Sequence, residues 1–134
     1  MATYQRTLRA PITLTGVGLH SGASATLRLL PAPVGSGIVF VRTDVSGTDN
    51  RIPALWSHVV DTRMCTVIAN AAGVRVGTIE HIMAALRGAE VTNAILELDG
   101  PEVPIMDGSS AAFMAAIDSI GTTEQDAPVY VIKV

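Results

Sequence analysis

Hydrophobic and polar residues alternate along much of the first half of the chain, a period typical of half-buried strands. The clearest case is 23–30, where Ala25, Leu27 and Leu29 fall on one face and Thr26 and Arg28 on the other. Further strands are predicted at 5–8, 12–15, 38–42, 52–62, 66–70, 94–99 and 129–134. Glycine- or proline-rich turns at 16–22 and 31–37 separate some of these segments. The first half of the chain is therefore predicted to be mostly β-structure.

Two later segments change to the 3.6-residue period of a helix. In 79–87 the apolar residues recur every three or four positions, with Thr78 as the predicted N-cap and Gly88 after the last turn. A second helix is predicted at 111–120, capped by Ser109 or Ser110 and ended by Gly121. The order β-rich, α, β, α, β favours an α+β fold, a two-layer sandwich of mixed β-sheet with both helices on one face.

The second predicted helix is apolar around most of its circumference. Beyond the face that carries Phe113 and Ile117, a further face carries Ala111, Met114 and Ala115. A helix of this kind is usually buried on both sides. Either these alanines simply lie at the surface, or the helical layer is a surface for a partner.

Composition narrows the function classes. The chain of 134 residues is one domain, and its 49% hydrophobic and 16% charged residues exclude disorder. A formal net charge of -3 gives no indication of nucleic-acid binding. The single cysteine excludes an intrachain disulfide. No secretory signal and no apolar run of the ~20 residues needed for a membrane span is present, so a cytoplasmic location is expected.

One pair of residues carries candidate chemistry. Glu80 and His81 fall in the first turn of the first predicted helix, where a carboxylate and an imidazole serve as general base and metal ligand in zinc hydrolases. By itself a Glu-His dipeptide is a weak signal, and it is not the His-Glu-x-x-His pattern of zinc proteases. The chain has three histidines, so any histidine-based site draws on a small set.

The surroundings of this pair strengthen the signal. In order and approximate spacing, nearly the whole chain resembles the bacterial UDP-3-O-acyl-N-acetylglucosamine deacetylases, the zinc enzymes of lipid A synthesis. The stretches that carry the resemblance are 5–8, 15–22, 31–33, 42–44, 61–62, 65–66, 78–81 and 101–109. The last two read Thr-Ile-Glu-His and Pro-Glu-Val-Pro-Ile-Met-Asp-Gly-Ser.

The resemblance implies an architecture and a set of roles. In that family two domains, each a β-sheet layered with two helices, pack helix layer to helix layer around the active site, and residues 1–134 correspond to the first domain. His81 would be a zinc ligand and Glu80 the general base. Four further residues lie in family motifs near the cleft: His20, Thr62, Cys65 and Asp107. Ordinary alternatives are a turn for Asp107, core filling for Cys65 and a hydrogen-bonded loop histidine for His20.

The family's other zinc ligands come from a His-Lys-x-x-x-Asp motif in the second domain, which this sequence lacks. If four ligands share the 10–16 kcal/mol of a structural zinc site equally, one histidine contributes about 3–4 kcal/mol, a roughly millimolar affinity. The isolated chain is therefore expected to bind no zinc and to be catalytically incompetent, with Glu80 vestigial and His81 the single zinc ligand of an incomplete site.

Three interpretations stay open. The chain is a single-domain relative with a binding, regulatory or assembly role, or the first domain of an ordinary deacetylase, or an enzyme whose site is built by self-association. We expect a homodimer through the two predicted helices, because Ala111, Met114 and Ala115 give the helical layer an apolar outer face. A nucleotide-sugar or another protein is a further expected partner.

Overall fold

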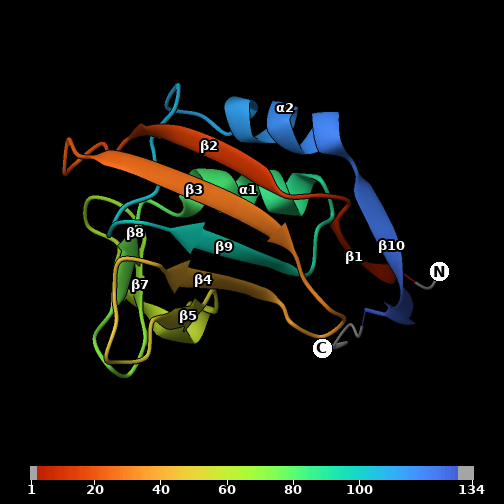
Figure 1. Cartoon of the computed structure of the whole chain (residues 1–134), viewed down its shortest axis with the longest axis horizontal. Coiled ribbons are helices and arrows are strands. Elements are labelled where there is room, and N and C mark those ends of the chain that lie inside the picture. Colours follow the sequence, from red (N-terminus) through yellow and green to blue (C-terminus); the bar gives the residue numbers. More distant parts are fainter. Residues whose placement is uncertain (1–2, 130–134) are drawn as a thin grey trace.

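The computed structural model describes residues 3–129 and shows the predicted α+β architecture (Figure 1). The first strands are β1 (Tyr4–Leu8), β2 (Ile12–Val17), β3 (Ser24–Pro31), β4 (Ile38–Arg42) and β5 (Arg51–Pro53). A short 3-10 helix η1 (Trp56–His58) and strands β6 (Val59–Asp61), β7 (Val67–Ala69) and β8 (Arg75–Gly77) follow. The remaining elements are α1 (Glu80–Gly88), β9 (Ala94–Leu98), α2 (Ala111–Ile120) and β10 (Thr122–Pro128).

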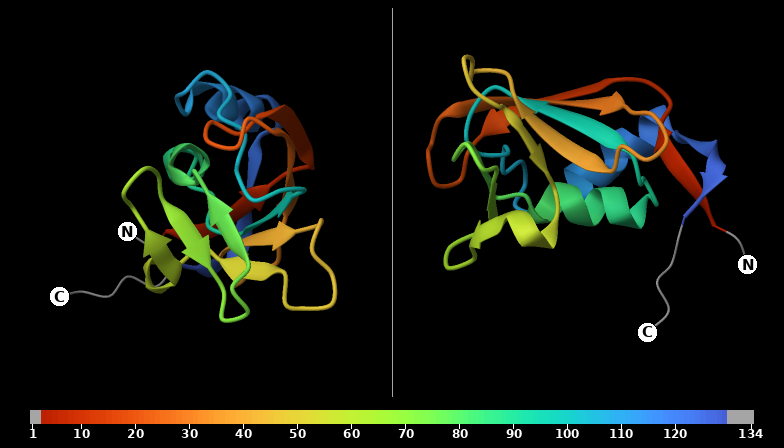
Figure 2. Two further views of the ribbon diagram at one scale, coloured as in Figure 1. Left: turned by 90° about the vertical axis from the view of Figure 1, so that its left-hand side faces the viewer. Right: turned by 90° about the horizontal axis from the view of Figure 1, so that it is seen from below.

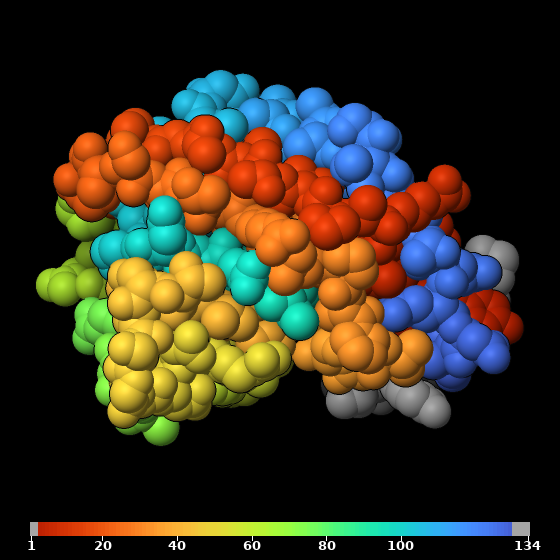
Figure 3. Space-filling view, viewed as in Figure 1, coloured from red at the N-terminus to blue at the C-terminus, as the bar shows by residue number. Residues whose placement is uncertain are grey.

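The main sheet has five strands in the order β2-β3-β9-β4-β5. Its pairs are antiparallel except β4–β9, which is parallel, so the sheet is mixed as predicted. The register sets Leu27 opposite Leu98 and Leu29 opposite Leu96, and all four side chains are fully buried. The predicted alternation of 23–30 is thereby confirmed, and it directs one face of the sheet into the core. The opposite face of the sheet lies at the surface (Figure 3).

Both α-helices cover the same face of this sheet (Figure 2). Helix α1 buries Ile82, Ala85 and Leu86, and α2 buries Phe113 and Ile117. The two helices consequently form one layer and the sheet forms the other, and the hydrophobic core lies between these two layers.

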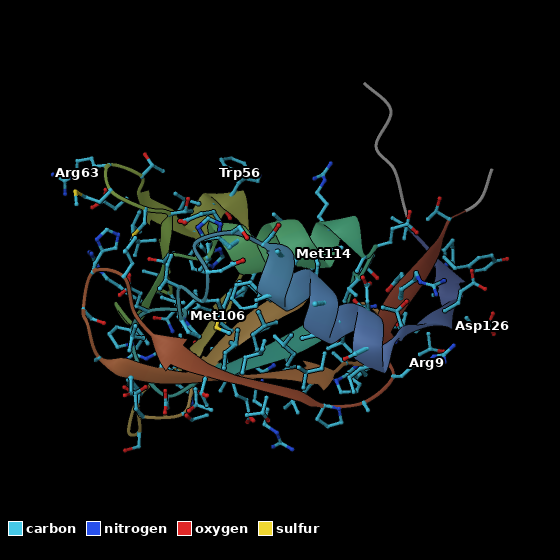
Figure 4. All side chains as sticks on the ribbon, turned by 90° about the horizontal axis from the view of Figure 1, so that it is seen from above. Arg9, Trp56, Arg63, Met106, Met114 and Asp126 are labelled. Carbon is cyan, nitrogen blue, oxygen red and sulfur yellow. The ribbon has the colours of Figure 1, made fainter. Side chains whose placement is uncertain are left out.

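The outer face predicted for α2 differs in one residue. Ala111 and Ala115 are exposed, but Met114 is half-buried and turns toward α1 (Figure 4). A Cβ built on Gly88 of α1 would lie 3.4 Å from the sulfur of Met114. The small residue at position 88 lets the flexible Met114 side chain fill the gap between the two helices.

The strands of the structure differ from the predicted ones at several places. Segment 52–62 is not one strand, because Leu55 and Trp56 project into solvent and η1 interrupts it; Trp56 is 89% exposed and points away from the molecule (Figure 4). Strand β8 was not predicted, and it joins β6 and β7 in a separate sheet. Strand β10 was not predicted either, and it pairs with β1. The strand expected at 129–134 lies outside the described residues except for Val129, which is not in a strand.

Within residues 3–129, no helix is long and apolar enough to cross a membrane.

Candidate functional site

The first turn of α1 places Glu80 against the beginning of β7. The backbone N–H of Thr66 donates a hydrogen bond of 3.0 Å to Glu80 Oε1. The other carboxylate oxygen, Oε2, is buried and has no hydrogen-bond partner among the described residues. Buried polar atoms are rarely left unpaired, so the free Glu80 Oε2 atom is a candidate functional group.

The N-terminus of α1 is not capped as predicted. Thr78 lies one residue too early, in a left-handed conformation with φ 58, and the N-cap position belongs to Ile79, which makes no side-chain cap. The Thr78 hydroxyl instead donates a 2.7 Å hydrogen bond to Glu102 Oε2. Because Thr78 precedes the N-cap position by one residue, its hydroxyl does not cap the helix, and the charged Glu102 carboxylate is a strong acceptor for its proton. Helix α2 begins after Ser110, with Ser109 Oγ accepting from the N–H of Ala111 at 3.1 Å.

Glu102 is the residue that the sequence interpretation missed. Its carboxylate is buried and accepts from the N–H of His20 at 3.1 Å and of Ser21 at 3.0 Å, besides the Thr78 hydroxyl. Burial by itself would raise the pKa of Glu102, but the Thr78, Ser21 and His20 hydrogen bonds outweigh it and leave the pKa below its ordinary value. The sequence offered two signals for it: an acidic residue between prolines and apolar residues, and its place in the 101–109 stretch that carries the family resemblance.

Two of the predicted cleft residues share a pocket. His20 and Cys65 line a pocket of about 420 Å³ together with Glu102. His20 is exposed, whereas Cys65 is half-buried and directly precedes Thr66, the donor to Glu80. The loop around His20 and the start of β7 therefore meet next to the first turn of α1.

Asp107 lines a different pocket and follows the left-handed residue Met106, with φ 55. Asp107 Oδ1 accepts from the amide of Ser109 at 3.0 Å and from its hydroxyl at 2.9 Å, which is the turn-forming arrangement considered for this residue. These hydrogen bonds, with a smaller contribution from the charge of His81, lower the pKa of Asp107. Asp107 is thus within electrostatic reach of His81.

Thr62 lies apart from the other candidates. It is exposed and lines a different pocket, between Asp61 and Arg63. The Arg63 guanidinium donates to Asp61 at 3.0 and 3.2 Å and, with the Arg63 amide, lowers the pKa of Asp61 to about 2. Nothing in these contacts connects Thr62 to Glu80.

A metal site is not complete in this part of the molecule. Residues 3–129 contain no group of three or more His, Cys, Asp or Glu side chains that could hold a metal ion. The residues do fit one part of such a site: His81 supplies an imidazole, and Glu80, the preceding residue, has a carboxylate oxygen without a partner among the described residues. A catalytic zinc ion requires about three protein ligands, more than the described residues bring together.

Comparison with known proteins identifies the family. A model of the UDP-3-O-acyl N-acetylglycosamine deacetylase family matches residues 5–134. The chain belongs to this family. The match includes Glu80, His81 and Glu102, and it confirms the relationship expected from the sequence motifs.

Curated relatives show the same relationship and also its extent. The UDP-3-O-acyl-N-acetylglucosamine deacetylase of Myxococcus xanthus is 60% identical over 124 residues, covering 92% of this chain and 39% of the relative. The enzyme of that name from Phenylobacterium zucineum is 51% identical over 131 residues, covering 98% of this chain and 45% of the relative. This chain therefore spans less than half the length of these members of the family.

Proposed function

We propose that this chain supplies one half of the active site of a zinc-dependent deacetylase acting on UDP-3-O-acyl-N-acetylglucosamine. The observation that carries the proposal is the Glu80 carboxylate, with one oxygen held by the Thr66 amide and the other buried without a partner among the described residues. His81 follows it directly in the sequence. A carboxylate fixed in this way has one oxygen free to accept a proton. Membership of the deacetylase family supports the assignment of substrate class.

The proposed reaction is hydrolysis of an acetamide. The oxygen of a water molecule bonds to the acetyl carbon while Glu80 Oε2 takes one of its protons. The carbon–nitrogen bond then breaks, the amine nitrogen receives a proton, and acetate and the free amino sugar are released. His81 would hold the zinc ion, which when bound polarises the carbonyl and lowers the pKa of water.

The remainder of the site is proposed to come from outside the described residues. Its source is either the part of the family enzymes that this chain does not match or a second protein chain. Self-association through the α1–α2 layer is one such arrangement, and the exposed residues Ala111 and Ala115 support it. A chain that self-associates without activity would instead have a binding, regulatory or assembly role.

A chimera tests the catalytic proposal. The matched segment of the Myxococcus xanthus deacetylase is replaced by this chain, and acetate release from the UDP-sugar is measured. Because a general base contributes about 10²–10⁴-fold, Glu80→Gln should lower the rate by at least about a hundredfold. The matched control is Glu97→Gln on β9, whose carboxylate makes only a peripheral 3.7 Å ion pair with Arg28. A folded, zinc-loaded chimera that is inactive, or one unaffected by Glu80→Gln, would contradict the proposal.

Solution mass tests self-association. We expect light scattering on the 134-residue chain to give twice the mass of one chain, and Ala115→Glu to return it to one. A mass of one chain from micromolar to millimolar concentration would exclude the dimer. Dimer formation without acetate release would favour the binding or assembly role.

A further inference from the structure

We infer that Glu102 is a positioning residue for the Glu80–His81 pair: its buried carboxylate ties the 18–21 loop to Thr78 and so fixes the first turn of α1. The inference rests on the function proposed for that pair. Glu102 itself lies before α2 and does not touch Glu80 in the contacts of the described residues; its effect passes through Thr78.

The side chain of Glu102 joins two distant parts of the chain. Oε1 accepts from the N–H of Ser21 at 3.0 Å, both oxygens lie 3.1 Å from the N–H of His20, and Oε2 accepts from the Thr78 hydroxyl at 2.7 Å. No other side chain among residues 3–129 makes hydrogen bonds both to this loop and to the β8–α1 connection. Without Glu102 these two segments lose their polar link.

The backbone around Glu102 holds the same connection. Gly77 and Glu102 form an isolated parallel bridge, in which the N–H of Gly77 donates to Pro101 O at 2.8 Å and the N–H of Val103 to Gly77 O at 3.1 Å. These bonds fix the last residue of β8. The next residue, Thr78, turns the chain into α1 through its left-handed φ of 58, and the bond to Glu102 holds the side chain of that residue.

The bond to Glu102 therefore acts at the residue where the chain enters α1. Glu80 and His81 follow Thr78 by two and three positions, so a change in the backbone at Thr78 changes the positions of both side chains. The space around Glu102 is equally restricted, since a Cβ on Gly18 would lie 2.3 Å from Oε1. An ionised carboxylate is costly to bury, and a role limited to filling space would be met by an apolar residue. Its hydrogen bonds point instead to a role in fixing geometry.

Amide exchange in the whole 134-residue chain tests this inference without reference to activity. In ¹⁵N-labelled protein, Glu102→Ala and Thr78→Val should shift the amide signals of residues 78–81 and 20–21, while β9 amides stay unchanged. Glu102→Ala should also raise at least tenfold the hydrogen exchange of the His20 and Ser21 amides, whose hydrogen bonds Glu102 accepts. Val keeps the branched shape of Thr and removes only the hydroxyl. Glu102→Gln should have a smaller effect, because its amide oxygen and nitrogen still occupy both positions. Glu97→Gln is the matched control and should leave these signals unchanged.

The chimera gives a second readout. There, Thr78→Val should lower kcat about tenfold to a hundredfold and change KM less than threefold, with Glu102→Gln retaining more activity than Glu102→Ala. Unchanged amide signals at 78–81 in folded Thr78→Val protein would overturn the inference. This measurement decides the question even if the Glu102→Ala variant does not fold. An inactive chimera would overturn the proposed function alone, because the amide measurements stand independently.

Discussion

Substitution of Gly18 by alanine should destabilise the fold through Glu102. Gly18 is buried, and an added Cβ would lie 2.3 Å from Glu102 Oε1 and 2.4 Å from Ser21 Oγ. Carbon atoms of side chains essentially never approach such atoms within 3.0 Å, so the carboxylate has to move away. Such a movement lengthens the hydrogen bonds from His20 and Ser21, which are now 3.1 and 3.0 Å.

The expected cost follows from these contacts. Losing one hydrogen bond to a charged group costs about 1.5–3 kcal/mol, and overpacking a buried position about 1–3 kcal/mol. We therefore expect Gly18→Ala to lower the free energy of unfolding by about 3–5 kcal/mol. With a urea dependence of about 1.5 kcal/mol per molar, a loss of 3 kcal/mol lowers the unfolding midpoint by about 2 M.

Urea unfolding followed by circular dichroism measures this effect, with Gly100→Ala as the control. A Cβ at Gly100 would have no other atom within 4 Å, so the free energy of unfolding of Gly100→Ala should be unchanged or raised by up to about 1 kcal/mol. In a Glu102→Ala background the same Gly18→Ala change should cost at least about 2 kcal/mol less, because the clashing carboxylate is gone. Equal costs in both backgrounds, or equal midpoints for Gly18→Ala and Gly100→Ala, would refute the reasoning.

Two further predictions concern charge and core. Because hydrogen bonds hold the folded-state pKa of Glu102 below its ordinary value of 4.5, its ionised form contributes stability above about pH 4.5 that is lost as pH falls through the folded pKa. The difference in unfolding free energy between the parent and Glu102→Gln should therefore shrink from pH 7 to pH 3 in urea titrations; a constant difference would contradict this. Phe113→Ala, at a fully buried position of α2, should lower the free energy of unfolding by about 3–5 kcal/mol. The control Ala115→Ser, on the exposed side of the same helix, should lower it by about 0.5 kcal/mol or less. Similar unfolding midpoints for the two variants would show that α2 does not pack on the core.

The parts of the fold that the sequence predicted are those in which side-chain burial has a clear period. Strand β3 was placed correctly because Leu27 and Leu29 alternate onto one face of the strand, and helix α2 because Phe113 and Ile117 fall on one face of the helix. Strand β10 shows the opposite case. Its residues are almost all polar, and it is held by backbone pairing with β1 rather than by burial, so no hydrophobic pattern marks it.

The candidate site divides in a similar way. Glu80 and His81 are neighbours in the sequence, and a motif is sufficient to find them. Glu102 meets Thr78 across 24 positions and His20 across 82, and such contacts follow from the pairing of Gly77 with Glu102, which no local pattern predicts. The N-cap expected at Thr78 was wrong because the N-cap position is Ile79, one residue later, and no local pattern predicts the hydrogen bond that the Thr78 hydroxyl donates to the distant Glu102.

Residues in the left-handed conformation lie close to the candidate site, and one of them is Thr78, the residue wrongly predicted as the N-cap. Among residues 3–129, three residues other than glycine have positive φ: Thr78, Glu90 and Met106. Glu90 follows the end of α1, where this conformation is common. Thr78 and Met106 instead precede the His81 and Asp107 regions, and each such residue costs on the order of 1–3 kcal/mol. Glycine at position 78 would relieve this cost but would lack the hydroxyl that Glu102 accepts. The strain at Thr78 is therefore explained by the hydrogen bond that fixes the first turn of α1.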